Sequence, residues 1–245
     1  MKYIIANWKM SIDDAKIDKF LNTLKTQVSS KNVVCGVATP FVYINKVLPT
    51  LSQYHWLVGA QNVSFAESGA YTGEISAKML REQGVNFCIV GHSERRVMFG
   101  ETDEIVNTKI QRLLEQNLTP LLCIGETLEQ HEQNKTNLVL KKQLQSDLAD
   151  IKYVDKLIIA YEPVWAIGTG KSASTKDIQQ NILFIKQTLG KMYGDKSQDI
   201  PVLYGGSVNP KNAQSIFLLN CVDGALVGGA SLDCQKFLDI VHSMQ

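Results

Sequence analysis

The chain has 245 residues, of which 44% are hydrophobic and 20% charged, with 25 basic against 24 acidic side chains. This length suits one large domain or two small ones, and the near-neutral charge without a basic block argues against a nucleic-acid partner. No apolar run reaches the ~18 residues of a membrane helix, and the first residues lack the pattern of a signal peptide. Five scattered cysteines without a Cys-x-x-Cys pair fit reduced thiols, so we expect a cytoplasmic protein with no membrane partner.

Eight short runs rich in valine and isoleucine recur along the chain, and each is followed by a stretch with apolar residues at helical spacing. One such stretch opens at Thr102, a suitable helix cap, and spaces Ile105, Ile110, Leu113 and Leu114 like the buried face of a helix. Because the runs are apolar throughout, we expect parallel strands that helices cover on the outside. The predicted strands are Tyr3–Ala6, Val33–Ala38, Leu57–Gln61, Phe87–Gly91, Pro120–Ile124, Leu157–Tyr161, Val202–Tyr204 and Ala225–Gly228.

Eight strand–helix units in a chain of this length favour an α/β fold of the closed (β/α)8 barrel type, since open doubly wound sheets usually have fewer units. No linker or low-complexity tract divides the sequence, so we expect residues 1–245 to form a single barrel domain. Active sites in such barrels lie where strands end and loops begin. The residues that follow each predicted strand are therefore the candidates for chemistry.

The sixth predicted strand ends at Glu162, because Pro163 cannot donate a hydrogen bond to a sheet. A carboxylate is thus predicted at the tip of a rigid element, although a surface glutamate before an ordinary loop is the plain alternative. The next segment suits a hinged lid, because stiff or bulky ends flank a small, glycine-rich middle. It consists of Pro163, Val164, Trp165, Ala166, Ile167, Gly168, Thr169, Gly170 and Lys171. Within it, Trp165 either anchors the lid by packing or fills a gap at its hinge.

Other strand ends carry further polar groups. The first strand is followed by Asn7 and Lys9, and the fourth by His92 and Glu94. A lone histidine or lysine in such a place is usually structural, but coincidence hardly explains a lysine, a histidine and a glutamate from three strands in one ring. After the seventh and eighth strands come small residues that either expose backbone N–H groups to an anion or serve tight turns: Gly205, Gly206, Ser207, Gly228 and Gly229.

Four segments of the sequence resemble the triosephosphate isomerase family, in the same order and without large insertions. They are Asn7–Met10 (Asn-Trp-Lys-Met), Val90–Arg96 (Val-Gly-His-Ser-Glu-Arg-Arg), Ala160–Lys171 and Tyr204–Val208. The resemblance implies a TIM barrel that interconverts dihydroxyacetone phosphate and glyceraldehyde 3-phosphate in glycolysis and gluconeogenesis, without cofactor or metal. The chain departs from common family residues at Ser11, Thr39 and Ser172, none of which is assigned to chemistry.

The resemblance also assigns roles. It makes Glu162 the base that removes a proton beside the carbonyl, and His92 and Lys9 the groups that stabilise the enediolate. A neutral His92 is carried over from the family, which is a standard example of this pairing, and a short helix opening after it would disfavour its cation. Glu94 is expected to pair with Lys9, and Asn7 to orient the substrate. The phosphate is expected at Gly168, Ser207, Gly228 and Gly229.

A loop at 65–74, small and uncharged at its middle, resembles the family's interdigitating loop. We therefore expect a homodimer in which Thr72 touches the partner's catalytic strand and Gln61 supports the loop.

Two other functions stay open. A sugar-phosphate aldolase of the Schiff-base kind needs a lysine in mid-barrel, whereas Lys9 follows the first strand and the sixth strand has none. A non-catalytic phosphate sensor would keep the pocket but needs no base. Near the site, we interpret Cys123 as a packing residue, because this chemistry needs no covalent step, and Arg95 and Glu101 as structural charges.

Overall fold

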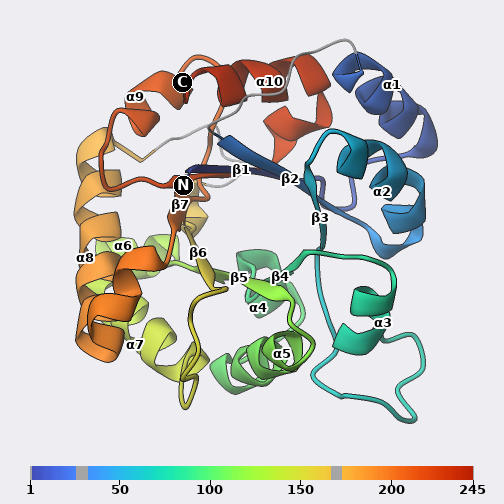
Figure 1. The fold of residues 1–245 in the computed structure, drawn as a ribbon. Coiled ribbons are helices and arrows are strands. Elements are labelled where there is room, and N and C mark those ends of the chain that lie inside the picture. The colour runs from blue at the N-terminus through green and yellow to red at the C-terminus, as the bar shows by residue number, and fades with distance from the viewer. Residues whose placement is uncertain (1, 26–32, 167–172, 245) are drawn as a thin grey trace.

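The computed structural model describes residues 2–25, 33–166 and 173–244. Its eight strands are parallel and close into a barrel in chain order, with β8 beside β1, and Figure 1 shows the ring of helices outside them. The predicted α/β barrel is therefore confirmed. The strands are β1 (Lys2–Asn7), β2 (Val33–Thr39), β3 (Leu57–Ala60), β4 (Phe87–Val90), β5 (Thr119–Ile124), β6 (Ile158–Tyr161), β7 (Val202–Tyr204) and β8 (Gly224–Val227).

The helices alternate with the strands, and several begin at a polar cap. Thr102 caps α5 as predicted, because its hydroxyl accepts the N–H of Ile105. Buried Val106, Ile110 and Leu113 form the inner face of that helix, whereas Ile105 and Leu114, expected on the same face, are half-buried. The helices are α1 (Asp14–Leu24), α2 (Ile44–Gln53), α3 (Ala77–Glu82), α4 (Ser93–Met98), α5 (Asp103–Glu115), α6 (Leu128–Glu132), α7 (Thr136–Asp147), α8 (Thr175–Tyr193), α9 (Ala213–Phe217) and α10 (Cys234–His242).

Apolar side chains fill both the inside of the barrel and the layer between strands and helices. In β4, Phe87 and Ile89 belong to the inner cluster, while Cys88 and Val90 belong to the outer one. This alternation explains why the strands read as continuous apolar runs. The five cysteines are buried and free, and no helix in the described ranges is long and apolar enough to span a membrane.

Three predicted strand ends lie one residue too far along the chain. Gln61, Gly91 and Gly228 follow their strands instead of ending them. At Gly91 the reason is conformational, since its φ of 66° turns the chain out of the sheet into the left-handed region. The polar residues that follow in the sequence therefore lie at the end of the barrel where β1, β4 and β6 finish.

Candidate active site

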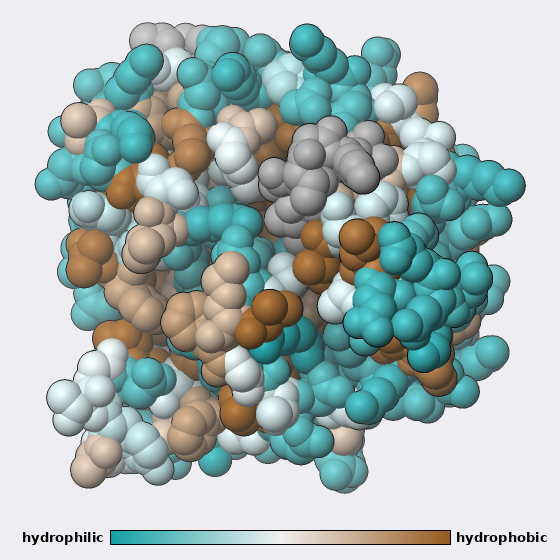
Figure 2. Space-filling view, turned by 180° about the vertical axis from the view of Figure 1, so that it is seen from behind, coloured by the Kyte–Doolittle hydropathy of each residue, from teal (hydrophilic) through white to brown (hydrophobic). Residues whose placement is uncertain are grey.

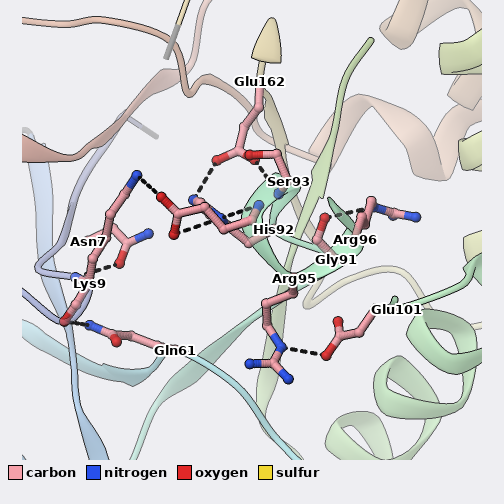
Figure 3. A network of polar contacts seen from close by, with 11 residues as sticks. Asn7, Lys9, Gln61, Gly91, His92, Ser93, Arg95, Arg96, Glu101 and Glu162 are labelled. Atoms are coloured by element: carbon pink, nitrogen blue, oxygen red, sulfur yellow. Dashed lines mark hydrogen bonds and ion pairs between the residues drawn. The ribbon is translucent and has the colours of Figure 1, made fainter. Parts of the chain in front are cut away.

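Residues from three strand ends meet in one cavity of about 320 Å³. Asn7 is the last residue of β1, Lys9 and His92 follow β1 and β4, and Glu162 follows β6. Figure 3 shows the side chains of His92 and Glu162 pointing toward one another, with Lys9 and Asn7 beside them. The predicted convergence of these groups is therefore present. The cavity is lined by Asn7, Trp8, Lys9, Ser11, His92, Glu162, Gly205, Gly206, Ser207, Val208, Asn209, Leu226, Gly228, Gly229, Ala230 and Leu232.

Glu162 is buried, with only 2% of the residue exposed, so the alternative of a surface glutamate is wrong. Its Oε1 lies 3.2 Å from Nε2 of His92, and its Oε2 accepts the N–H of Ser93 at 3.1 Å. Behind it, Gly205 packs so closely that a Cβ there would come within 2.8 Å of the Glu162 Cγ. The carboxylate is thus held on two sides, and close packing against it requires glycine at position 205.

His92 caps helix α4, and this fixes which ring nitrogen carries hydrogen. Its Nδ1 accepts the N–H of Glu94 at 3.2 Å, so in the neutral ring the hydrogen belongs to Nε2. Nε2 is the nitrogen that faces Glu162. With this tautomer, a neutral ring donates its hydrogen from Nε2 on the side that faces Glu162 and the cavity.

Lys9 has a left-handed backbone, with φ of 50°, that its neighbours hold in place. The side-chain oxygen of Asn7 accepts its N–H at 3.1 Å, and Nε2 of Gln61 donates to its carbonyl at 3.0 Å. Its Nζ lies 2.6 Å from Oε1 of Glu94, which is the pair that the resemblance implies. The lysine side chain remains 27% exposed, so its charge reaches the cavity.

The loops after β7 and β8 form the opposite wall of the cavity. Ser207 follows β7, and Gly229 begins a short 3₁₀ helix, Gly229–Leu232. A Cβ added at Gly228 would lie 3.7 Å from the Lys9 side chain, and one at Gly229 would meet nothing within 4 Å. These residues leave space for an anion beside the lysine charge. Gly168, the fourth predicted phosphate contact, lies outside the described residues.

Only the first part of the predicted lid can be placed. Pro163 is buried, and Val164, Trp165 and Ala166 form a 3₁₀ turn. The Trp165 indole donates to Oε1 of buried Glu126 at 2.8 Å and stacks on the ring of His131. Burial raises the pKa of the Glu126 carboxyl. Ile167, Gly168, Thr169, Gly170 and Lys171 lie outside the described residues.

Other polar groups near the cavity serve packing. Cys123 is fully buried, and burial together with the neighbouring Glu162 raises the pKa of its thiol well above the ordinary range, which disfavours a nucleophilic thiolate. Arg95 pairs with Glu101, to which Lys109 also donates, as expected for structural charges. Among the residues that the structure describes, no group of three or more histidines, cysteines and acids could hold a metal ion.

The loop between β3 and α3 projects from the barrel, at the lower right of Figure 1. Thr72 is exposed on it, while Gln61 stands at its start and donates to the carbonyls of Lys9 and Ala38. Gln61 therefore joins the base of the loop to the ends of β1 and β2. In Figure 2, where the same loop lies at the lower left, its surface is mostly pale and tan, as small uncharged residues would colour it.

Two contacts of the site were missed from the sequence. The Ser93 N–H binds the carboxylate, and Gly205 packs against the same side chain. The first could have been found, because a predicted helix opening at Ser93 leaves its N–H without an intrahelical partner. The second could not, since it depends on how closely β6 and β7 approach.

A barrel with a buried carboxylate, a histidine N–H and a lysine at its strand ends is built as an enzyme that moves protons. The family model for triosephosphate isomerase matches residues 2–244. The triosephosphate isomerases of Alkaliphilus metalliredigens and Clostridium botulinum are each 45% identical over 98% of both chains, and that of Methylococcus capsulatus is 42% identical over 98% of this chain and 97% of its own. The chain belongs to the triosephosphate isomerase family, and is accordingly an isomerase.

Proposed function

We propose that the chain interconverts dihydroxyacetone phosphate and D-glyceraldehyde 3-phosphate through an enediolate, using the cavity at the ends of β1, β4 and β6. The observation that carries the proposal is the 3.2 Å approach of Glu162 Oε1 to His92 Nε2 inside a cavity that also holds Lys9. A base and a hydrogen donor must flank two adjacent carbons of the substrate, and these two groups are close enough to do so.

In this proposal Glu162 takes a proton from one carbon and returns it to the next. The Nε2–H of His92 donates to the substrate oxygens, and Lys9 supplies positive charge where negative charge develops. The 3.2 Å contact leaves no room for a substrate atom between the two side chains, so they must separate as substrate enters. Each oxyanion donor contributes about 3–4 kcal/mol to transition-state stabilisation, which is two to three decades of rate.

The phosphate is proposed to bind at Ser207, Gly228 and Gly229, with Gly168 completing the site. Support comes from the open space at Gly229 and from the proximity of Gly228 to Lys9. Loops after the seventh and eighth strands are the usual phosphate location in such barrels. Asn7 orients the substrate, and Glu94 holds the lysine. No cofactor takes part in the proposed reaction.

We also propose that residues 1–245 form a single domain, that two such chains assemble as a homodimer, and that the protein is cytoplasmic. Large apolar side chains around the β3–α3 loop are exposed, which is unusual for a surface without a partner. A second copy of the chain would cover them, with Thr72 reaching the partner. They are Phe65 at 44% and Tyr71 at 46% exposure.

The experiment that tests this proposal is a coupled assay with glyceraldehyde 3-phosphate on the wild type and on Glu162→Asp. Retracting the carboxylate by one methylene should lower kcat on the order of 100-fold with little change in KM, because reaction geometry tolerates misplacement of about 1 Å poorly. Glu82→Asp, an exposed change on α3, is the matched control and should leave kcat unchanged. A near-normal kcat for Glu162→Asp would show that another group takes the proton.

The same preparation separates the alternative functions. A phosphate sensor predicts no turnover by the wild type. An aldolase predicts that borohydride traps the substrate on a lysine, but the lysine found in the described strands is Lys2, whose Nζ donates to the Val222 carbonyl at the far end of the barrel. We expect turnover without trapping.

A further inference from the structure

The guanidinium of Arg96, on helix α4, points inward beneath the site. The side chain is only 14% exposed. Its Nε donates to the carbonyl of Gly91 at 2.7 Å, and its Nη2 donates to the carbonyl of Cys123 at 3.3 Å. One planar group therefore binds the ends of two neighbouring strands, β4 and β5 (Figure 3 shows the Gly91 contact).

The β4 contact acts on the backbone of His92. Arg96 holds the carbonyl of Gly91 through its side chain, and its own N–H donates to the carbonyl of His92 at 3.1 Å. The fit is tight, because a Cβ at Gly91 would come within 2.7 Å of Arg96 Nη2. The two peptide groups that set the direction of the histidine ring are thus both bound to one residue.

The β5 contact acts behind Glu162. The residue after Cys123, Ile124, accepts the Glu162 N–H through its carbonyl at 2.7 Å. The next residue, Gly125, packs against the Glu162 carbonyl so closely that a Cβ could not fit. Arg96 therefore joins the strand that leads to the histidine to the strand that supports the glutamate.

Two carboxylates hold the guanidinium in this orientation. Asp103, the first residue of α5, lies 2.6 Å from Nη1, and Asp147, the last of α7, lies 2.6 Å from Nη2. The Asp147 side chain is fully buried, and its Oδ1 has no hydrogen-bond partner in the described part of the chain. Such buried ion networks often add little net stability compared with apolar packing, so stability alone is a weak reason for this one.

We propose that Arg96 is a positioning residue for the isomerase reaction, which sets the separation and direction of His92 and Glu162 through the backbones of β4 and β5. The inference rests on the proposed function. The planar guanidinium of Arg96 is essential, because a lysine in the same place has a single ammonium and cannot reach both strand ends and both acids. Among the described residues, Arg96 forms no hydrogen bond or ion pair with the loops after β7 and β8, so we expect phosphate binding to be independent of it.

The first test compares Arg96→Lys with the wild type. We expect kcat to fall on the order of 100-fold while KM stays within about threefold, since misplacement by about 1 Å acts on the chemical step. Inhibition by inorganic phosphate should be unchanged. Ile185→Val, a core change in α8, is the control for lost stability. The urea midpoints of the two variants are compared first. Ile185→Val should then retain full kcat although its fold is less stable.

Chemical rescue provides a readout that a purely structural role would not move. Arg96→Ala should regain part of its kcat when guanidinium is added far below denaturing concentration, and sodium chloride at equal ionic strength should have no effect. If Arg96→Lys or Arg96→Ala does not fold, Asp103→Asn keeps the arginine and loosens one side of its fork. That variant should lower kcat several-fold with unchanged KM.

The outcomes separate the two proposals. A wild type without isomerase activity would refute the proposed function itself. An active wild type, together with a folded Arg96→Lys or Asp103→Asn that retains full kcat, would overturn only the positioning role. A fall in kcat that the Ile185→Val control reproduces at equal stability would overturn it as well.

Discussion

The N–H of Glu94 lies 3.2 Å from Nδ1 of His92, and this one main-chain contact selects the hydrogen that the ring presents to the cavity. Protonation of Nδ1 would break the contact and put a cation at the opening of α4. On the other side, the Ser93 N–H binds the Glu162 carboxylate. At the residue scale, backbone groups of α4 therefore orient both the histidine and the glutamate.

His92→Gln tests the importance of the ring. Glutamine keeps a hydrogen donor but cannot pass a proton between two substrate oxygens, so kcat should fall on the order of 100-fold. The fraction of isotope retained from labelled substrate should also change, which mass spectrometry of the product measures. His242→Gln, near the exposed end of α10, is the control. An unchanged exchange pattern would contradict the shuttle role.

Strands and turns were largely predictable, whereas their contacts were not. The β6 tip at Glu162 followed from an apolar run stopped by proline, and the cap at Thr102 from residue type alone. Gln61 was assigned to β3, but that strand ends at Ala60 because its ladder with β4 ends at the Ala60–Cys88 pair. Register depends on the neighbouring strand, and so do contacts such as Arg96 with the Cys123 carbonyl, which joins residues 27 positions apart.

Two glycines test the packing of elements in opposite directions. Gly59 of β3 faces Phe87 of β4 inside the barrel, and a Cβ there would come within 2.2 Å of the ring. Gly190 of α8 has ample space, since the nearest atom to its Cβ would be 3.7 Å away. A change to alanine should therefore overpack the barrel interior at Gly59 and stabilise helix α8 at Gly190.

Gly59→Ala should lower the free energy of unfolding by about 1–3 kcal/mol. Gly190→Ala should raise it by up to ~1 kcal/mol, because alanine is the better helix former. Urea unfolding followed by circular dichroism measures both. The pair Gly59→Ala/Phe87→Leu should recover part of the loss by clearing the ring. Equal stability of Gly59→Ala and wild type would show that Phe87 moves aside at no cost.

At the scale of the whole molecule, the β3–α3 loop connects the proposed interface to the cavity. Its first residue, Gln61, donates to the carbonyls of Lys9 and Ala38 at 3.0 Å each. Lys9 has a left-handed backbone, which persists only when its surroundings hold it. A change in the loop of a dimer should therefore alter the backbone conformation of Lys9. Thr72 itself is exposed and lies outside the cavity of its own chain.

Thr72→Arg is the sharpest test of this connection. In the proposed dimer a long charged side chain at this position would clash with the partner, so the chain should become monomeric and lose activity on the order of 100-fold. Light scattering after size exclusion gives the mass, and the coupled assay gives kcat on the same fractions. Thr72→Ser should remain dimeric and active. A Thr72→Arg monomer with full activity would separate assembly from catalysis, and would mean that contacts within one chain are sufficient to hold Lys9.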